Sequence, residues 1–306
     1  MDGLFSLEPR SASSGAAASA YAIDAPTNET TAPLSPLVFA SPHSGRIYPK
    51  ALLDACDAPL LALRRIEDAF VDQLFAGVVD AGAPLLRALM GRAYVDLNRS
   101  EGELDPEMFA DSPPLWTGPR SPRVEAGLGC LPRIAHGGLK IYRRKLKRVE
   151  AEARIRDVYR PYHKALQSLL HAAEQHFGGA VLIDCHSMPS DVTAGGNEAE
   201  IVLGDRFGAA CAPALTAFLE REFADRGYRV RRNAPYAGGF VTLTYGRPTQ
   251  RWHAVQIEIR RDLYMDEARV EPNDGFEALQ KDLTGVARAL AEWTRAFADN
   301  AYKKAS

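Results

Sequence analysis

Four short apolar runs of this chain lead directly into side chains that can bind a metal ion, transfer a proton or grip an anion. These places are Ser41-Pro42-His43-Ser44-Gly45, Asp96-Leu97-Asn98-Arg99, Asp184-Cys185-His186-Ser187 and Glu258-Ile259-Arg260-Arg261. A lone histidine near a strand end is more often a hydrogen-bonded structural residue than a ligand. Four such places together favour a functional site.

Two histidines, a spare carboxylate and an arginine would suffice for metal-assisted cleavage of an amide. A catalytic zinc takes three protein ligands from histidine and carboxylate and leaves one position for water, whose pKa it lowers. An unligated carboxylate nearby can take the proton and deliver it to the leaving nitrogen. An arginine beside an asparagine can hold a substrate carboxylate.

Cys185 suggests a different mechanism, because a cysteine beside a histidine can act as a nucleophile. Adjacent residues of a strand point to opposite faces, so Cys185 and His186 cannot easily face one substrate. We therefore interpret Cys185 as a core residue.

The elements that would position these residues alternate between strand and helix. We expect strands at 37–41, 181–184, 200–203, 228–232 and 254–259, with one bent strand or two in 85–97. We expect helices at 59–81, 138–177 with an interruption at Pro161, 207–226 and 275–298. This alternation predicts one α/β domain over residues 37–300, with a mostly parallel sheet covered by helices on both faces. Ligands of such sheets bind outside the carboxyl ends of the strands.

Two segments of the chain are expected to be irregular. Residues 100–137 are rich in Pro, Gly, Ser and Asp, and the loop 103–131 within them is a candidate lid. Residues 238–246 are rich in glycine and are expected to form turns that let the backbone approach a ligand.

Composition narrows the class of protein. The 306 residues include 37 Lys and Arg against 39 Asp and Glu, which argues against a nucleic-acid-binding protein. No apolar run approaches the roughly 20 residues that span a bilayer. The four cysteines form no CxxC pair, so we expect a reducing, cytoplasmic setting. Residues 1–36 lack the basic and apolar parts of a signal peptide and are expected to be a disordered tail.

The order of seven motifs resembles the N-formylglutamate amidohydrolase family. The motifs are PHSG (42–45), IEDAFVDQLF (66–75), YVDLNRSEG (94–102), RPYHKAL (160–166), IDCHSMPS (183–190), GGFVTLTYGRP (238–248) and QIEIRRDLYMDE (256–267). The resemblance extends from about residue 37 to about residue 295. It implies the three-layer α/β fold of the distantly similar zinc carboxypeptidases, with a mixed sheet between helices.

The resemblance implies that His43 and His186 bind one divalent metal ion, zinc or another. Zinc carboxypeptidases carry an acidic ligand three residues after the first histidine, where this chain has Arg46. The third ligand is therefore expected from Glu67 or Asp68. Asp68 is favoured because it falls on the acidic position that family members carry before the VDxLF-like run.

The same resemblance assigns the proton-transfer and substrate-binding roles. Glu258 matches the general base, with a structural salt bridge to Arg260 or Arg261 as the alternative. Asn98 and Arg99 match the pair that grips the substrate α-carboxylate, and Arg92 is a second cation for the other carboxylate or for the oxyanion.

Several other side chains have less specific expected roles. Tyr245 could donate a hydrogen bond in the transition state or pack in the core. Asp96 is expected to orient Arg99 or its loop, and Asp184 to orient His43 or His186. Further cationic candidates are Arg133, Arg247 and His163.

The resemblance implies metal-dependent hydrolysis of N-formyl-L-glutamate to formate and L-glutamate, a step of histidine degradation. One alternative is a related amidohydrolase acting on another N-acyl amino acid or a small peptide. The other is a non-catalytic binding protein on the same scaffold. In the first two cases the partner is a small molecule, with no nucleic acid and no membrane involved.

Overall fold

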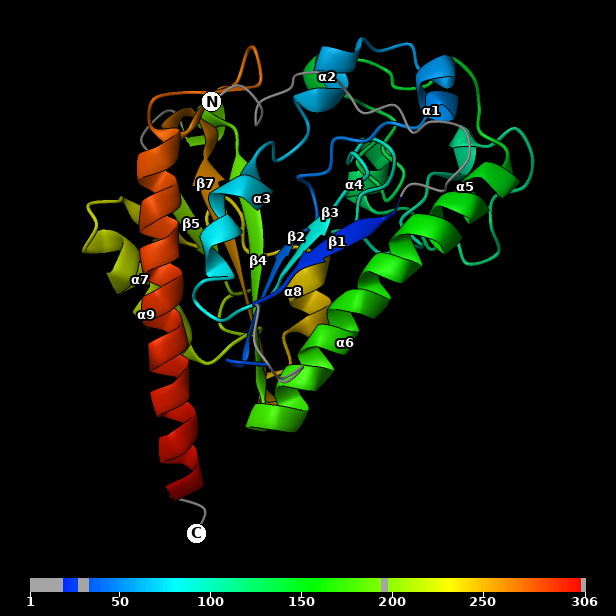
Figure 1. The fold of residues 1–306 in the computed structure, drawn as a ribbon. Coiled ribbons are helices and arrows are strands. Elements are labelled where there is room, and N and C mark those ends of the chain that lie inside the picture. Colours follow the sequence, from blue (N-terminus) through cyan, green and yellow to red (C-terminus); the bar gives the residue numbers. More distant parts are fainter. Residues whose placement is uncertain (1–18, 27–32, 194–197, 304–306) are drawn as a thin grey trace.

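A computed structural model describes residues 19–26, 33–193 and 198–303, and side chains up to residue 295. Its centre is a seven-stranded sheet (Figure 1). The strands in spatial order are β1 (Tyr21–Asp24), β3 (Leu85–Ala88), β2 (Leu37–Ser41), β4 (Ala180–Met188), β7 (Trp252–Arg260), β5 (Ile201–Gly204) and β6 (Val230–Arg232). A two-stranded hairpin, β8 (Met265–Asp266) with β9 (Glu271–Pro272), is separate from the sheet.

The sheet is mixed and mostly parallel. Neighbouring strands run parallel except in the pairs β1–β3 and β5–β7. Strands β4 and β7 form the longest ladder, which continues from Ala180↔Trp252 to Met188↔Arg260. The predicted α/β class with a mostly parallel mixed sheet is confirmed.

Helices cover both faces of this sheet (Figure 1). The α-helices are α1 (Lys50–Ala55), α2 (Leu60–Arg64), α3 (Val71–Leu74), α4 (Pro122–Glu125), α5 (Arg148–Arg154), α6 (Arg160–Phe177), α7 (Pro213–Ala224), α8 (Phe240–Tyr245) and α9 (Phe276–Lys303). The shorter turns are η1 (Ala76–Val78), η2 (Pro106–Met108), η3 (His136–Gly138), the π-helical turn η4 (Ile155–Tyr159), η5 (Ser190–Thr193), η6 (Pro248–Gln250) and η7 (Arg261–Leu263). Helices α3, α7 and α9 pack on one side, and α6 and α8 on the other.

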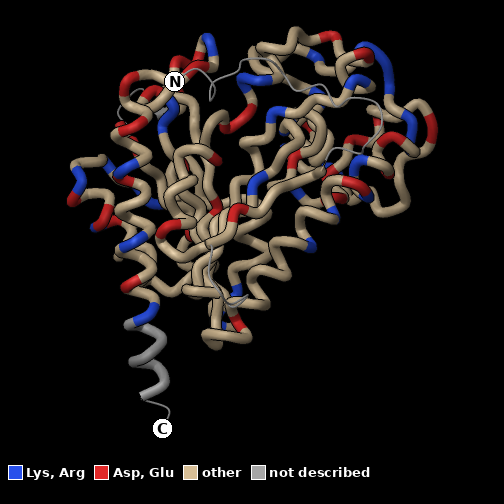
Figure 2. Tube along the Cα trace, in the orientation of Figure 1, with Lys and Arg blue, Asp and Glu red and all other residues tan. Residues whose placement is uncertain are grey.

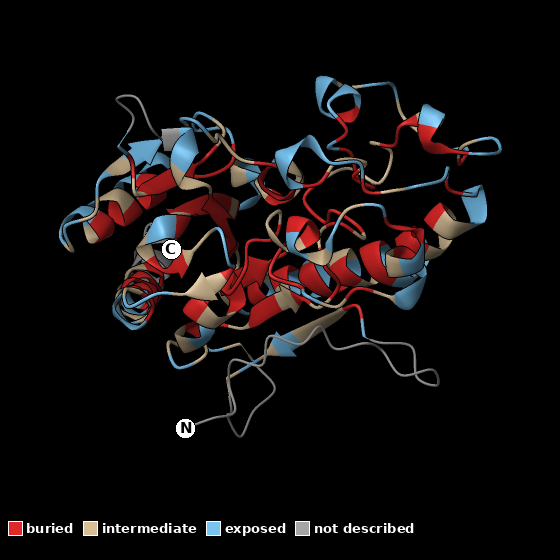
Figure 3. Ribbon diagram, turned by 90° about the horizontal axis from the view of Figure 1, so that it is seen from above, coloured by how far each residue is buried: buried red, intermediate tan, exposed pale blue. Residues whose placement is uncertain are grey.

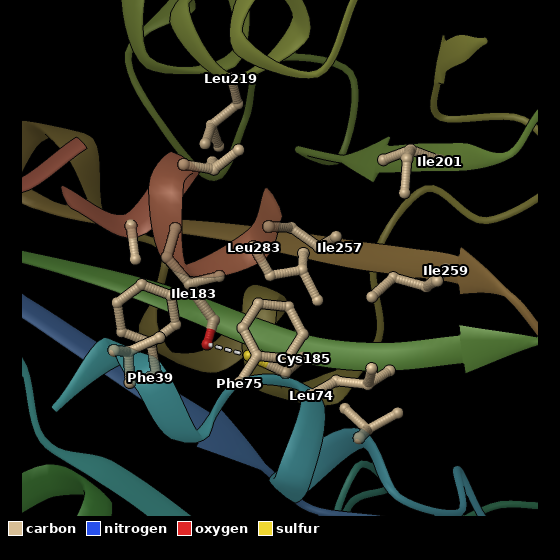
Figure 4. Packing of buried hydrophobic residues seen from close by; sticks show 14 of the residues in the cluster. Phe39, Leu74, Phe75, Ile183, Cys185, Ile201, Leu219, Ile257, Ile259 and Leu283 are labelled. Carbon is tan, nitrogen blue, oxygen red and sulfur yellow. Dashed lines mark hydrogen bonds between the residues drawn. The ribbon is translucent and has the colours of Figure 1, made fainter. Parts of the chain in front are cut away.

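Two large apolar clusters fill the space between the layers. In β4, Ile183 and Cys185 belong to the cluster under α3, α7 and α9, whereas Leu182 belongs to the cluster under α6 and α8. Figure 4 shows Ile183 and Cys185 among Phe39, Phe75 and Ile257. Side chains of a strand alternate between its faces, so Asp184 and His186 lie on the side of Leu182.

The distribution of buried residues follows the layers of the fold, whereas charged residues of both signs are spread over the chain. Buried residues concentrate in the sheet and on the inner faces of the helices that cover it (Figure 3). Lys and Arg are interspersed with Asp and Glu over the described chain (Figure 2), and over the whole sequence the two signs nearly balance, with a net charge of −2. No helix among the described residues is both long and apolar enough to cross a membrane.

The predicted tail contains a strand of the sheet. Tyr21–Asp24 pairs antiparallel with β3, and Asp24 accepts a hydrogen bond of 2.7 Å from Nε of Arg87. The prediction of a disordered tail through residue 36 was wrong for this strand, because its pairing partner is distant in sequence. Residues 1–18 and 27–32 lie outside the described part of the chain.

Other elements differ from prediction in their boundaries. Strand β4 extends through Met188, because its polar residues remain paired with β7. Tyr94 and Val95 form no strand, since the chain turns after β3 and the backbone NH of Tyr94 donates to the carbonyl of Gly91.

Prolines and glycines set three further helix boundaries. Helices α5 and α6 are joined by η4, where the backbone widens ahead of Pro161, which lacks an NH for a helical hydrogen bond. Helix α7 begins only at Pro213. The stretch expected to form turns after Gly238 contains the helix α8.

Candidate metal centre and active site

Three buried side chains from distant segments converge at the carboxyl-terminal ends of β2 and β4. His43 follows β2, His186 lies near the end of β4, and Asp68 precedes α3. Oδ2 of Asp68 lies 3.2 Å from Nδ1 of His43 and 2.8 Å from Nδ1 of His186. Each residue is at most 2% exposed. One ligand atom from each of the three lies within 4.8 Å of the others, so this group could hold a metal ion.

A second carboxylate stands behind each histidine. Nε2 of His43 lies 2.7 Å from Oδ1 of Asp96, and Nε2 of His186 lies 3.0 Å from Oδ1 of Asp184. The hydrogen bond of His43 with Asp96 fixes the orientation of that ring, whereas His186 and Asp184 form an ion pair without hydrogen-bond geometry. Both contacts use Nε2 and leave Nδ1 of each ring for a cation. Asp96 thus supports His43, and its Oδ2 accepts a hydrogen bond from Nε of Arg92. Its Oδ1 also accepts a hydrogen bond of 2.8 Å from the backbone NH of Asn98, so of the two predicted roles the contacts favour orientation of the loop over orientation of the Arg99 side chain.

Electrostatics keep this group charged. Burial by itself would raise the pKa of Asp68, but its contacts with His186 and His43 hold that pKa well below the usual range. Burial would lower the pKa of His186, yet the carboxylates of Asp184 and Asp68 raise it well above its usual value. Without a cation, a proton on His186 compensates part of the carboxylate charge, and a bound metal ion would take over that role.

The group formed by His43, Asp68 and His186 is called the metal-binding group below, because its ligand atoms have the chemistry that a divalent ion requires. Two imidazoles and one carboxylate are the ligand set of several catalytic zinc sites, although nitrogen and oxygen donors also accept other divalent metals. Both histidines have the carboxylate partners that metal-binding histidines usually have.

A break in the predicted helix 59–81 presents Asp68. Helix α2 ends at Arg64, and α3 starts only at Val71 after Phe70 adopts a left-handed backbone conformation with φ of 66°. The backbone NH of Asp68 donates to the carbonyl of His43 at 3.0 Å. The prediction of a continuous helix was wrong, because contacts with the His43 loop override the helical pattern of the sequence.

Glu67 points into a different environment. Its carboxylate accepts a hydrogen bond from the hydroxyl of Tyr48 and lies 3.6 Å from Nε of Arg64. The geometry therefore brings Asp68, and not Glu67, to the two histidines. Burial raises the pKa of Glu67 to about 7.

Glu258 stands beside His186 on the next strand. The two residues are paired in the parallel ladder of β4 and β7, so their side chains share one face of the sheet. Oε1 of Glu258 accepts a hydrogen bond of 2.6 Å from Nε2 of Gln256. Burial raises the pKa of Glu258 to about 7, where a carboxyl group can both accept and return a proton.

The alternative role for Glu258 is not seen among the described residues. Arg260 pairs with Asp262 and Glu200, and Arg261 pairs with Asp68. Glu258 forms an ion pair with neither arginine within the part of the chain that the structure describes.

Asn98 contacts the metal-binding group directly. Its Nδ2 lies 3.2 Å from Nε2 of His186, and its Oδ1 accepts a hydrogen bond from the backbone NH of Val241. A Cβ on Gly239 would lie 2.4 Å from Nδ2 of Asn98, so this approach of the chain to Asn98 requires glycine.

Two half-buried arginines are near this asparagine. Arg92 donates from Nε to Oδ2 of Asp96 at 2.9 Å. Burial opposes its charge, but the carboxylates of Asp96, Asp68 and Glu258 outweigh burial and raise its pKa. Arg99 donates to the carbonyls of Asn98 and Leu128, and burial lowers its pKa.

The remaining candidates are occupied by contacts elsewhere. The hydroxyl of Tyr245 lies 3.0 Å from Nδ1 of His163, and the ring packs in the cluster under α6 and α8. Nε of Arg133 lies 2.7 Å from Oδ2 of Asp105, and Arg247 donates to the carbonyl of Thr244. None of these contacts involves the metal-binding group.

Cys185 is fully buried in the opposite cluster, as the alternation of the strand predicts. Burial raises the pKa of its thiol well above the ordinary value, which disfavours the thiolate that a nucleophile needs. All four cysteines are buried and free.

Sequence reasoning missed three residues around this site. Gln256 lies two positions before Glu258 on the same strand face, a spacing that could have identified it. Arg261 binds Asp68, which no local pattern indicates. Tyr236 packs on Met188 and Val202, and Val202 is paired with Glu258.

The fold and the site together define an α/β protein with a buried His-Asp-His group that could hold a metal ion, beside a carboxyl group whose pKa is raised by burial. A family model for N-formylglutamate amidohydrolase matches residues 35–265. This chain belongs to the N-formylglutamate amidohydrolase family.

Individual relatives agree with this assignment. The chain is 34% identical over 271 residues to an N-formylglutamate deformylase of Pseudomonas aeruginosa, covering 85% of this chain and 94% of that protein. It is 37% identical to an N-formylglutamate amidohydrolase of Ralstonia eutropha of known crystal structure, with a TM-score of 0.85 over 91% of this chain and 99% of that one. A gene product of Agrobacterium tumefaciens shares the fold, with 18% identity and a TM-score of 0.58 over 94% of this chain and 96% of that one.

Proposed function

We propose that this protein is a metal-dependent amidohydrolase that cleaves N-formyl-L-glutamate to formate and L-glutamate. The observation that carries the proposal is the position of Glu258, paired in register with His186 beside the buried His43–Asp68–His186 group. Membership of the N-formylglutamate amidohydrolase family supports the choice of substrate. We place the reaction in histidine degradation and the protein in the cytoplasm.

His43, Asp68 and His186 would hold one divalent ion, for which we propose zinc. When bound, such an ion supplies a Lewis acid and a water of lowered pKa. Because His43 contacts Asp96 and His186 contacts Asp184 through Nε2, each imidazole would bind the ion through Nδ1.

Glu258 acts on the proton of the attacking water. One of its oxygens is fixed by Gln256, so the carboxylate keeps a defined orientation. Water oxygen bonds to the formyl carbon while Glu258 accepts its proton. Glu258 then donates that proton to the amide nitrogen as the C–N bond breaks, which releases the amino group of glutamate and formic acid. The formic acid gives up the second proton of the water to become formate.

Asn98 and Arg99 grip one carboxylate of the substrate dianion, and Arg92 faces the other carboxylate or the oxyanion. If Nε2 of His186 carries the proton toward Asp184, Nδ2 of Asn98 has no acceptor on that ring and can donate to the substrate. The substrate role predicted for Tyr245 lacks comparable support, because its hydroxyl is paired with His163.

The test is release of glutamate from N-formyl-L-glutamate by the purified protein, as isolated, after chelation and after zinc is restored. We expect activity that is lost on chelation and regained with zinc. A parallel set of N-acetyl-glutamate, N-formyl-leucine and a glutamyl dipeptide tests the acyl group and the side chain separately. Faster cleavage of any of these than of N-formyl-L-glutamate would contradict the proposed substrate.

A further inference from the structure

Arg261 makes an unusual set of contacts for a residue outside the proposed chemistry. It follows β7 in η7 and is only 7% exposed. Its Nη1 donates to the carbonyl of Arg65 at 3.0 Å, and its Nη2 donates to the carbonyl of Glu67 and to Oδ1 of Asp68 at 2.6 and 3.0 Å. Its Nε donates to Oγ of Ser187 at 3.1 Å.

These contacts brace the turn that presents Asp68. Three of the four acceptors belong to residues 65–68, the segment between α2 and α3 that replaces the predicted helix. A planar guanidinium can satisfy several acceptors in fixed directions, which a lysine ammonium cannot reproduce. One side chain from the end of β7 therefore fixes both the backbone before Asp68 and the carboxylate itself.

The two oxygens of the Asp68 carboxylate therefore have different partners. Oδ1 accepts from Arg261 and lies 3.3 Å from the hydroxyl of Ser187. Oδ2 faces Nδ1 of both histidines. A carboxylate with one oxygen engaged by a buried cation offers only the other oxygen to a metal ion.

We propose that Arg261, assisted by Ser187, is a positioning residue that makes Asp68 bind the metal ion through Oδ2 alone. The inference rests on the metal site of the proposed function and not on its substrate. It goes beyond a bracing role, because it predicts an effect on the coordination of the ion as well as on the stability of the turn.

The test compares three variants loaded with Zn²⁺ and with Co²⁺. Arg261→Lys keeps the positive charge but cannot reproduce the four hydrogen bonds. Ser187→Ala removes only the weaker contact to Oδ1 and one acceptor of Arg261. Tyr264→Phe is the matched control, because the hydroxyl of Tyr264 donates to the carbonyl of Ala69 and also contacts Ser187, but makes no hydrogen bond to Asp68 or Arg261 within the described residues.

We expect Arg261→Lys to weaken Zn²⁺ binding by about 10- to 100-fold in a chelator competition. We expect the visible spectrum of its Co²⁺ form to lose intensity, since a second carboxylate oxygen would raise the coordination number. Ser187→Ala should show the same changes to a smaller extent. Tyr264→Phe should keep the affinity and spectrum of the wild type, although it also loses a hydrogen bond.

Several outcomes would overturn the proposal. Unchanged Co²⁺ spectra in both Arg261→Lys and Ser187→Ala would show that Arg261 does not control the ligand oxygen. Equal losses of metal affinity in Arg261→Lys and Tyr264→Phe would reduce its role to bracing the turn. A wild-type protein that binds no divalent metal would reject the proposal outright, whereas failure to cleave N-formyl-L-glutamate with metal bound would reject only the substrate. If Arg261→Lys does not fold, the spectrum of Ser187→Ala decides alone.

Discussion

The two faces of strand β4 have opposite roles although their residues alternate along one short segment. Ile183 and Cys185 are packed among apolar side chains under α3, α7 and α9. Asp184 and His186, each one position further, are buried among charged and hydrogen-bonding groups. Both faces are equally inaccessible to water, so burial alone does not distinguish the core from the site. What distinguishes them is whether each buried polar atom has a partner or a cation to bind.

The largest effect expected on the polar face is that of Glu258→Gln. The amide keeps the shape of the side chain but cannot accept the proton of water, so kcat should fall by about 10²- to 10⁴-fold. Metal content, measured by elemental analysis, should remain that of the wild type.

The control for this variant is Ile257→Val, the preceding residue, which faces the apolar cluster. It should lose about 0.5–1.5 kcal/mol of stability with kcat unchanged. Near-wild-type turnover by Glu258→Gln would remove the acid–base role from the polar face.

On the apolar face, Ile183→Ala should lower the free energy of unfolding by about 2–5 kcal/mol, because it leaves a cavity between β4 and its neighbours. Zinc affinity and kcat of the folded protein should not change. Denaturant unfolding and a chelator competition measure the two quantities.

The matched change on the polar face is Asp184→Asn, which removes the charge behind His186. It should weaken zinc binding by about 10-fold or more. If Ile183→Ala lost the metal and Asp184→Asn retained it, the division between the two faces would be incorrect.

In the metal-free protein, the pH dependence of the free energy of unfolding should reveal the cost of burying the ionised carboxylate of Glu258. Burial raises the pKa of Glu258 from 4.5 to about 7. The folded state therefore holds a proton that the unfolded state releases between these values. This contribution to stability is fully present below pH 4.5 and is lost as the pH rises through 7, by on the order of 3 kcal/mol.

The comparison of wild type with Glu258→Gln isolates this contribution, since the amide does not titrate. The variant should gain stability relative to the wild type as the pH is raised from 5 to 8, measured by urea unfolding after chelation. Parallel pH profiles of the two proteins would show that Glu258 is not strained in the folded state.

The smallest expected effect is that of Cys185→Ala. The thiol packs in the apolar cluster, so the variant should lose about 1 kcal/mol of stability, with kcat and metal binding unchanged. Thermal unfolding and a turnover assay are sufficient. A loss of turnover comparable to that of Glu258→Gln would bring back a thiol nucleophile.

Much of the fold follows from local patterns. The apolar runs at 37–41 and 181–184 predict β2 and the first half of β4, and the spacing of Tyr162, Ala165, Leu166 and Leu170 places one buried stripe along α6. The period of two along a strand also suffices to place Cys185 and His186 on opposite faces of β4. These features depend only on contacts close in sequence or on the geometry of a single strand.

The sequence could not decide how distant segments meet. A helical pattern covers residues 59–81, yet the backbone breaks at 65–70, because Asp68 must reach His43 and Arg261 must bind the turn. The tail residues Tyr21–Asp24 gain a strand only through pairing with β3.

What the sequence alone determined was the class of the sheet and a set of candidate site residues, namely His43, Asp68 or Glu67, His186 and Glu258. Only the tertiary structure decided that Asp68 faces the histidines while Glu67 faces Tyr48. Two adjacent carboxylates have the same local propensity. Their difference comes from donors that are more than a hundred residues away, at His186 and Arg261, and no local pattern specifies such contacts.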